Sequence, residues 1–467
     1  MNKYLRNKLL FVSLFFIVLI VLLLPSGIRK LNHDPLVADG EFYYDLRVSK
    51  DLSKNILWDS FEDRIHKASL FYYVNSVAIY LIGTEATIFI SLMLGLLSFI
   101  LFYNIIKLFF EEKETLIMAS SLFILSPIFI YLFVKFSIAS LATVLSLTFI
   151  YFYIKKSYWS VPFLILISIT DFSFFLVNIV LMMVYYLYDR KTKLFLLNII
   201  LSLISLMVFV YVHRGFFLFK NLFLEASFGN FFTSFGAVVG ISFFYLFLGI
   251  IGLFTVWKRK KEFVYMIISM IIILIFSFFN STGRIFLNMY LSIFAGLVIT
   301  FLLKRRWALY IIKRFTLLLI FCVVIFSTTV YIDQLVNSEP KQDIVQTLQV
   351  LKSFDKGVVF SHEKYGSFIE YYANKNSFVD EQSMNYNSYS HLKNISEEIF
   401  LSRNLEHTKY LLNEENIKYI IITPEMKKGL VWKREGEGLI FLLENSNSFS
   451  KLKSVNGVEL WVINSFS

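Results

Sequence analysis

Long apolar runs separated by short polar connections dominate the chain from Leu9 to about Tyr331. Each run is long enough to cross a hydrocarbon core of roughly 30 Å as a helix. The runs lack the period-two alternation of a membrane barrel strand, and only helices or closed barrels satisfy their backbone groups in lipid. The pattern therefore predicts a polytopic α-helical membrane protein. Composition agrees, because 57% of the 467 residues are hydrophobic and the mean hydropathy is +0.65.

Basic residues gather in the short connections and orient the spans. They form five groups: Lys3/Arg6/Lys8, Lys155/Lys156, Arg190/Lys191/Lys193, Lys258 to Lys261, and Lys304 to Arg306. Lys and Arg accumulate in cytoplasmic loops, so all five are predicted to be cytoplasmic. An even number of crossings between groups then gives about eleven spans, with the N-terminus inside as a retained signal anchor and the C-terminus outside. The net charge of +11 is thus attributed to topology and not to nucleic-acid binding.

The expected spans follow from this rule. They cover residues 9–25, 86–109, 115–134, 136–154, 159–170, 172–188, 194–213, 234–257, 262–279, 285–303 and 309–330. Residues 69–83 are apolar but short, and are predicted to form an interfacial helix on the outer leaflet. The predicted organisation is a transmembrane domain at 1–331, whose first outer loop covers 26–85, and a small extracytoplasmic α/β domain at 332–467.

The tail after Tyr331 has the mixed pattern of a small folded domain. "KQDIVQTLQVLKSF" has helical periodicity, whereas "GVVFSH" and "KYIIIT" are short β-branched runs bounded by turn residues. "GLIFLLE" and "GVELWVIN" are predicted to be later strands. About 130 residues suffice to bury a core.

Carboxylates crowd the segment "DPLVADGEFYYDLRVSKDL", directly after the first span. Such groups beside a membrane exit suit a lipid substrate whose headgroup must reach them. A carboxylate there can accept a proton from an attacking hydroxyl or hold a divalent cation against phosphate oxygens. Asp39 and Glu41 are two residues apart in one turn and are the main candidates. The plain alternative is that they are ordinary solvated loop residues.

Residues 41–47 of this segment, "EFYYDLR", resemble the first outer loop of the oligosaccharyltransferase catalytic subunit. Glu41 falls where that family has its acid, and Arg47 where it has its arginine. Residues 66–109 and "SSLFILSPIFIYLF", with Pro127 in place, resemble the wider GT-C superfamily of membrane glycosyltransferases, which includes protein mannosyltransferase-like enzymes. Asp39 is similar to the Asp that many GT-C members carry just past the first span.

A second resemblance lies in the tail. "GVVFSHEKYGSFIEYYANKNSFVDEQ" resembles the start of the oligosaccharyltransferase outer domain, where a WWDYG motif recognises the acceptor peptide. Glu363, Tyr365 and Gly366 fall within the equivalent pentad. Tyr365 and Gly366 agree with it, the tryptophans are missing, and Lys364 replaces the Asp. The resemblance therefore implies a shared layout with a different acceptor.

The resemblance leaves the cofactor open. Metal-dependent members, which use a divalent cation such as Mg²⁺ or Mn²⁺, carry paired acids after the third span, but here that connection reads "FVKFSIAS". Asp171 or Glu225 could substitute, although each also suits an ordinary interfacial position. Metal-independent members use a first-loop carboxylate as base. No nucleotide-binding motif is present.

A site that binds the phosphate of a lipid needs cationic side chains. Arg284, at the predicted outer end of a span, could bind a lipid phosphate in bidentate fashion or snorkel to the interface as an anchor. Arg47 and Lys135 are weaker candidates for the same role.

Together the resemblance implies an inverting glycosyltransferase in the cell envelope. It would move a sugar from a polyprenyl-phosphate donor to a glycan, lipid or protein acceptor on the outer membrane face. The alternatives are a non-catalytic lipid-glycan transporter or an accessory subunit of a surface-glycan pathway. Transporters usually carry charged residues at mid-membrane and two comparable halves, whereas these spans are almost free of charge. Membrane lipid is the expected environment, and no nucleic-acid partner is expected.

Overall fold

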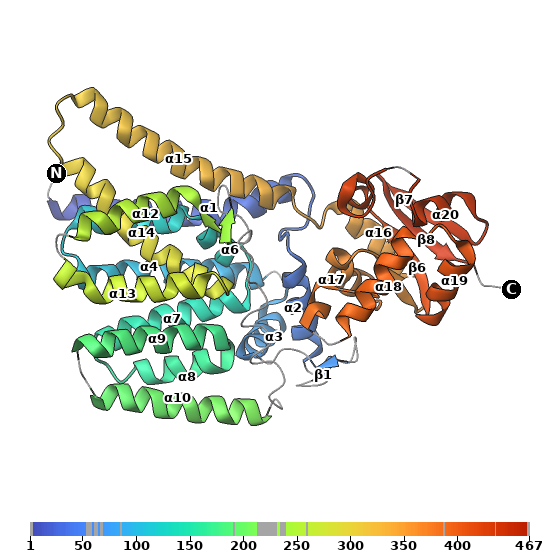
Figure 1. The fold of residues 1–467 in the computed structure, drawn as a ribbon, viewed down its shortest axis with the longest axis horizontal. Helices are drawn as coiled ribbons and strands as arrows, with labels where there is room; N and C mark the ends of the chain where they lie inside the picture. The colour runs from blue at the N-terminus through green and yellow to red at the C-terminus, as the bar shows by residue number, and fades with distance from the viewer. Residues whose placement is uncertain are drawn as a thin grey trace. The chain divides into compact units, whose positions relative to one another are not determined.

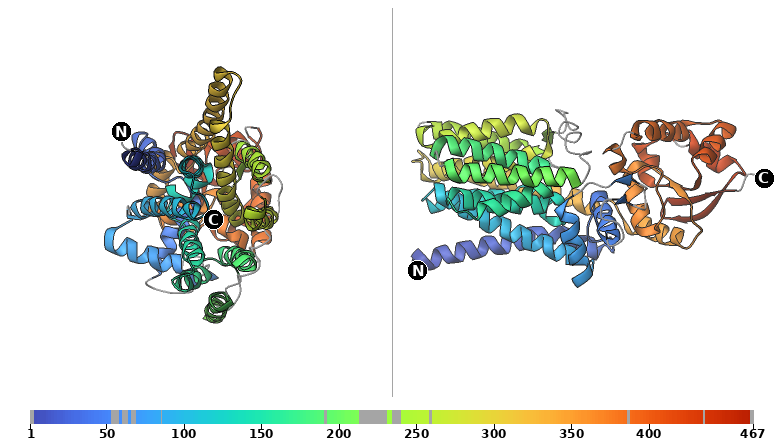
Figure 2. Two further views of the ribbon diagram at one scale, coloured as in Figure 1. Left: turned by 90° about the vertical axis from the view of Figure 1, so that its left-hand side faces the viewer. Right: turned by 90° about the horizontal axis from the view of Figure 1, so that it is seen from below.

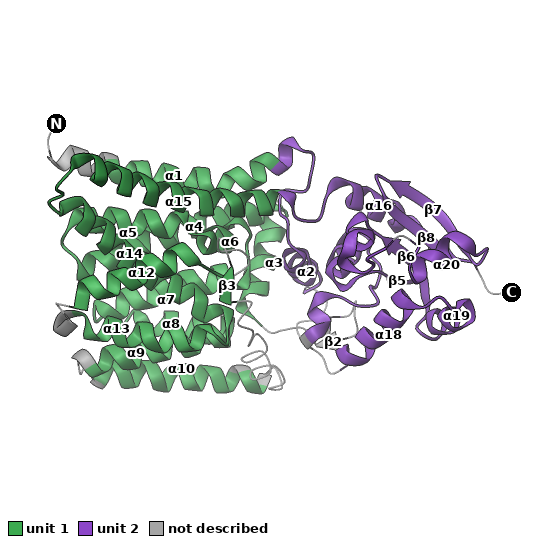
Figure 3. Ribbon diagram, turned by 45° about the horizontal axis from the view of Figure 1, so that its top comes forward, with its two compact units in different colours: residues 1–28, 67–336 green, residues 29–66, 337–467 purple. Residues whose placement is uncertain are grey.

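The chain divides into two compact units. The computed structural model describes residues 3–52, 58–59, 64–65, 69–84, 86–189, 192–212, 231–233, 240–257, 260–385, 388–434 and 436–464. Unit 1 comprises residues 1–28 and 67–336, and unit 2 comprises residues 29–66 and 337–467 (Figure 3). Residues 29–66 therefore cluster with the C-terminal segment and not with the apolar helices that flank them in the sequence.

Unit 1 is built from apolar helices that run side by side (Figures 1 and 2). They are α1 (Lys3–Leu31), α3 (Leu70–Ile82), α4 (Ala86–Phe109), α5 (Lys113–Leu125), α6 (Pro127–Val134), α7 (Ile138–Ile154), α8 (Ser160–Thr170), α9 (Phe172–Asp189), α10 (Thr192–Val212), α12 (Phe243–Val256), α13 (Lys260–Ser277), α14 (Ser281–Lys304) and α15 (Tyr310–Asn337). Two short strands, β3 (Phe232–Thr233) and β4 (Ile241–Ser242), pair in parallel. The described part of each expected span is mainly helical, and in the span expected at 234–257 residues Ile241 and Ser242 form β4 before α12 begins.

Several of these helices can cross a bilayer by length and composition. Within the described residues these are α1 from Leu10, α4 from Thr87, α14 and α15, with a fifth if α5 and α6 are one broken span. Other apolar helices are shorter, at 10–17 residues. The chain is therefore a membrane protein, and the count of about eleven spans stays a prediction.

The span expected at 115–134 consists of two helices, because α5 and α6 meet at an angle of 60°. Pro127 has no backbone N–H to continue α5, so it begins a new helix. The hydroxyl of Ser126 caps that helix by accepting a hydrogen bond from the Phe129 N–H at 3.2 Å. The sequence "SP" thus ends one helix and starts the next.

α14 lies in the interior of unit 1, since 78% of its most apolar stretch is buried. A side chain at Gly296 would place its Cβ 2.7 Å from the Ala119 Cα of α5. A side chain at Gly252 of α12 would likewise collide with the carbonyl of Phe294. Small residues let helix backbones approach closely in lipid, where van der Waals packing drives association. The glycines therefore let α5 and α12 pack directly on α14.

Unit 2 is a mixed α/β structure. Its helices are α2 (Gly40–Asp51), α16 (Gln342–Lys352), η3 (Glu363–Tyr365), α17 (Gly366–Phe368), η4 (Ile369–Ala373), η5 (Glu381–Asn385), α18 (Tyr389–Leu401), α19 (Leu405–Glu414), η6 (Met426–Leu430) and α20 (Leu439–Asn445). Its strands are β1 (Trp58–Asp59), β2 (Arg64–Ile65), β5 (Val358–Phe360), β6 (Ile417–Ile422), β7 (Phe449–Val455) and β8 (Val458–Ile463). The main sheet has the order β5-β6-β8-β7.

The sheet combines one parallel pair with two antiparallel pairs. β5 and β6 run parallel, and β8 runs antiparallel to both β6 and β7. Asn456 and Gly457 join β7 to β8 with φ values of 46° and 87°. Positive φ at both central residues is what a two-residue type I′ hairpin turn requires, and Asn-Gly adopts it at low cost. The predicted helix at "KQDIVQTLQVLKSF" and the strands at "GVVFSH", "KYIIIT" and "GVELWVIN" are confirmed.

The strand predicted at "GLIFLLE" is wrong, because these residues form the helix α20. Leu439, Ile440, Leu442 and Leu443 are buried, whereas Phe441 is exposed. Spacings of one, three and four residues describe one helix face, whereas a strand would have buried alternate positions. A short apolar run cannot be assigned by its hydrophobicity alone.

Candidate functional site

The two segments that carry the sequence resemblance pack against each other in unit 2. α2, which contains "EFYYDLR", lies against α17 and η4, which contain "GSFIEYYA". The Tyr43 ring is the centre of the contact, with its centroid 5.5 Å from Phe368, 5.1 Å from Tyr371 and 5.3 Å from Tyr372. Aromatic pairs at such separations add stability beyond the area they bury. The fold thus brings Tyr43 into contact with aromatic residues that lie more than three hundred positions away in the sequence.

Asp39 and Glu41 lie at the start of α2, both half-buried. Asp39 is the N-cap, and its Oδ1 accepts a hydrogen bond from the Glu41 N–H at 2.9 Å. Between them, Gly40 leaves room for Glu381, whose Oε2 is 3.4 Å from the position a Cβ would take. The start of α2 thus holds the carboxylates of Asp39 and Glu41 close to the carboxylate of Glu381.

Glu381 is the electrostatic centre of this cluster. Crowding by protein atoms, followed by the negative charges of Asp39, Glu41 and Glu363, raises the pKa of Glu381 to about 7, although part of its side chain stays exposed. The charged form is disfavoured because it is desolvated and faces like charges. We call Asp39, Glu41, Glu363 and Glu381 the carboxylate cluster, in which Glu381 has the raised pKa.

Replacing Glu381 with glutamine should stabilise the protein at about pH 8 by roughly 1 kcal/mol, a value reduced for its solvent exposure. In the unfolded chain a glutamate ionises near pH 4.3, whereas in the fold Glu381 ionises near 7, so folding stability falls as pH rises between these values. The difference between variant and wild type should vanish near pH 4. Thermal unfolding of the full chain across this range measures it, and a difference independent of pH would contradict the assignment.

Arg47 of α2 forms buried ion pairs with Asp59 and Glu370. Its Nη1 and Nη2 each donate to an oxygen of Asp59 at 2.7 Å, and its Nε lies 3.0 Å from Glu370 Oε2. Burial lowers the pKa of Arg47, but the charges of Glu370 and Asp59 outweigh burial and raise it above its usual value. Five-donor guanidinium groups suit such bidentate contacts. Arg47 thus ties α2 to η4, and its role as a phosphate ligand stays a prediction.

The residues of the degenerate acceptor motif differ in what they face. Glu363 is half-buried, accepts a hydrogen bond from the Tyr389 hydroxyl at 2.8 Å and adds charge to the carboxylate cluster. Tyr365 is buried, and its hydroxyl donates to Glu425 at 2.7 Å while it accepts from Thr423 at 2.9 Å. Tyr365 therefore contributes to packing inside unit 2.

Gly366 is also an interior position. A Cβ there would lie 2.5 Å from the Cβ of Asp380 and 2.7 Å from the carbonyl oxygen of Val379. The chain segment that leads to Glu381 thus passes directly over Gly366. The glycine of the motif is needed for packing, which places Glu381 beside α2.

In unit 1, two predicted outer turns lie together. The Oδ1 of Asp171 caps α9 by accepting hydrogen bonds from the N–H groups of Ser173 at 2.8 Å and Phe174 at 3.1 Å. Asn280 caps α14, and its Nδ2 donates to the Ser173 hydroxyl at 3.1 Å. The two turns share one end of the unit, as the expected topology requires. Glu225, the other substitute acid, lies outside the described residues.

Arg284 and Lys135 belong to unit 1 and are both buried. Arg284 is in the first turns of α14, with Nε donating to the carbonyl of Ser277 at 3.0 Å. Lys135 follows α6, with its ammonium 4.7 Å from the centroid of the Tyr131 ring. A buried guanidinium does not fit a snorkelling anchor, since that would extend to the interface. Binding of phosphate by either residue stays a prediction.

Among the described residues, no three Asp, Glu, His or Cys side chains lie together in a way that could hold a metal ion. The negative charges of Asp39, Glu41 and Glu363 all raise the pKa of Glu381. Mg²⁺ is commonly held by one or two carboxylates together with substrate phosphates, so the use of a divalent cation stays a prediction.

Sequence reasoning missed Glu381, Glu370 and Asp59. Glu370 stands alone in the apolar run "SFIEYYA", and a single charge in such a run signals a buried pair. Glu381 carries no such signal, because its position beside α2 depends on packing at Gly366.

Comparison with known proteins identifies the fold. No protein-family profile and no curated protein matches this chain. The oligosaccharyltransferase AglB from Archaeoglobus fulgidus, solved with an inhibitory peptide and a dolichol-phosphate, is similar over 89% of this chain and 70% of its own, with TM-score 0.56 and 12% identity. ArnT from Cupriavidus metallidurans is similar over 97% of both chains, with TM-score 0.54 and 13% identity.

A third similar structure is the arabinofuranosyltransferase AftD from Mycobacteria. It matches 96% of this chain and 40% of its own, with TM-score 0.55 and 11% identity. All three are GT-C glycosyltransferases, so the chain has a GT-C-like fold. Identities of 11–14% carry no more than the fold.

Proposed function

We propose that this protein is a membrane glycosyltransferase that moves a sugar from a polyprenyl-phosphate donor to an acceptor outside the cytoplasm. The observation that carries the proposal is the carboxylate cluster at the start of α2, where the two resemblance-bearing segments meet. The GT-C-like fold supports it, and the dolichol-phosphate in the AglB structure supports a lipid-linked donor.

In the proposed step, Asp39 or Glu41 acts as general base. The carboxylate takes the proton of an acceptor hydroxyl while the hydroxyl oxygen attacks the anomeric carbon. The bond from that carbon to the donor phosphate breaks, and the lipid phosphate leaves with the bonding electron pair. Attack opposite the leaving group inverts the anomeric centre, by the geometry that inverting hydrolases use. Arg284 and Lys135 are the proposed phosphate partners.

The acceptor is proposed to differ from a sequon peptide. Tyr365 and Gly366 serve internal packing, and Glu363 presents a charge where the resembling family has tryptophans. An acidic surface of this kind favours a polar or cationic group on a glycan, lipid or protein acceptor.

Purified full-length protein in proteoliposomes should release polyprenyl phosphate from polyprenyl-phosphate sugars and transfer the labelled sugar to an acceptor extract. Mass spectrometry of both products checks the balance of the reaction. Sugar lipid that crosses the bilayer without cleavage would indicate a transporter, and neither cleavage nor movement across a broad donor panel would indicate an accessory subunit.

A further inference from the structure

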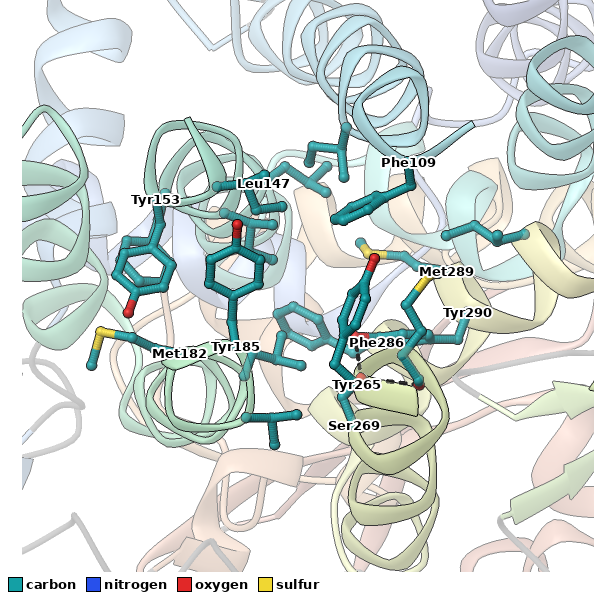
Figure 4. A pocket seen from close by; sticks show the side chains of 18 of the residues that line it. Phe109, Leu147, Tyr153, Met182, Tyr185, Tyr265, Ser269, Phe286, Met289 and Tyr290 are labelled. Carbon is teal, nitrogen blue, oxygen red and sulfur yellow. Dashed lines mark hydrogen bonds between the residues drawn. The ribbon is translucent and has the colours of Figure 1, made fainter. Parts of the chain in front are cut away.

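Unit 1 contains two adjoining cavities that the proposed glycosyl transfer does not use. The first, which we call the chamber, has a volume of about 100 Å³ and lies between α4, α7, α9, α13 and α14 (Figure 4). The second, the vestibule, has a volume of about 810 Å³. Phe109, Ile154, Tyr185 and Tyr265 line both, so the two cavities adjoin at these side chains, and we call them together the slot.

Aromatic rings wall the chamber. The centroid of Tyr185 is 5.6 Å from that of Tyr153 and 6.4 Å from that of Tyr265, which in turn lies 5.7 Å from Phe109. Figure 4 shows Tyr185 and Tyr265 standing next to each other between the helices. The Ser269 hydroxyl donates to Tyr290 at 2.8 Å, which satisfies polar groups at the wall. An apolar cavity of roughly 150 Å³ stays dry and binds benzene, so this chamber suits a short piece of hydrocarbon.

The vestibule is polar at its outer edge. Glu111 and Glu112 line it from the connection between α4 and α5, Thr115 from the first turn of α5, and Lys304 from the end of α14. The Lys304 ammonium lies 2.9 Å from Glu112 and 3.9 Å from Glu114, and all three side chains are about half exposed. This edge is at the end of unit 1 away from the Asp171 and Asn280 caps, since α9 and α14 start at those caps.

We propose that this slot holds one zwitterionic phospholipid from the leaflet at the α14 C-terminus. The polarity of the slot follows that of a lipid, with a charged edge at the helix ends and an aromatic interior one to two turns deeper. The end of an acyl chain fills the chamber, and the phosphate lies beside Lys304. Among the described residues that line the vestibule, the charges of Glu111 and Glu112 exceed that of Lys304 and therefore favour a headgroup that also carries an ammonium, such as phosphoethanolamine.

Native mass spectrometry of the full chain released from mixed phosphoethanolamine and phosphoglycerol nanodiscs tests this. Wild type should retain one phosphoethanolamine lipid. Ile150→Phe fills the chamber and should retain about tenfold less, whereas Leu196→Phe, on the exposed face of α10, should match wild type. The double variant Glu111→Lys/Glu112→Lys should prefer phosphoglycerol. No retained lipid, equal retention by Ile150→Phe, or a wild-type preference for phosphoglycerol would overturn the proposal.

A second measurement protects the test if Ile150→Phe does not fold. Wild type is labelled with phosphoethanolamine lipid that carries a diazirine at the end of one acyl chain. Crosslinks should concentrate on the peptides of α9 and α13 that contain Tyr185 and Tyr265. Crosslinks confined to the outward faces of α10 and α15 would refute the chamber as the binding site.

Discussion

Asp39→Asn or Glu41→Gln should lower sugar transfer by about 10²–10⁴-fold, the usual contribution of a general base. Each amide keeps the size of the acid but cannot accept a proton at neutral pH. Asp39→Asn also retains an N-cap as good as aspartate, so the helix start is preserved. Single-turnover transfer from a polyprenyl-phosphate sugar measures the loss, and the variant with the larger loss identifies the base.

The comparison needs a carboxylate from the same loop that lies outside the cluster. Asp34 accepts a hydrogen bond from the Gln342 N–H at 3.0 Å, and an amide oxygen at that position can do the same. Asp34→Asn should therefore transfer sugar at close to the wild-type rate. If Asp39→Asn and Glu41→Gln are both as active as Asp34→Asn, neither residue is the base.

Local patterns foretold much of the fold because the lipid-facing helices are specified locally. The run at 86–109 is the helix α4 with the same bounds, and Pro127 explains the bend that a hydropathy pattern alone overlooked. Where burial depended on packing, as in "GLIFLLE", the pattern failed. The helix at residues 69–83 is α3, and its interfacial position stays a prediction.

Part of the candidate site could be predicted from the sequence. Asp39 and Glu41 stand together in one turn, so their proximity needed no tertiary structure. Glu381 joins them from more than three hundred residues away, through the contact of Gly366 with Asp380. Likewise Arg47, expected at a phosphate, is enclosed by Asp59 and Glu370. A single sequence does not reveal such distant partners.

Arg47→Met should destabilise unit 2 by about 3–5 kcal/mol, because it strands two buried carboxylates. Side-chain exposures are 6% for Arg47, 1% for Asp59 and 0% for Glu370, so water cannot replace the lost partner. Methionine fills a similar volume without charge, so the cost comes from the unpaired charges and not from a cavity. Thermal unfolding or limited proteolysis of the full chain in detergent measures it.

Lys50→Met is the control variant, because it removes a positive charge from α2 without breaking the buried ion pair of Arg47. Lys50 is exposed, with its ammonium 4.5 Å from the Tyr371 ring centroid, and its loss should cost about 1 kcal/mol or less. The triple variant Arg47→Met/Asp59→Asn/Glu370→Gln removes all three charges and should recover more than half of the Arg47→Met loss. If the triple variant is no more stable than Arg47→Met alone, uncompensated burial of Asp59 and Glu370 is not the cause, and packing of the arginine stem against Tyr44 must account for the effect.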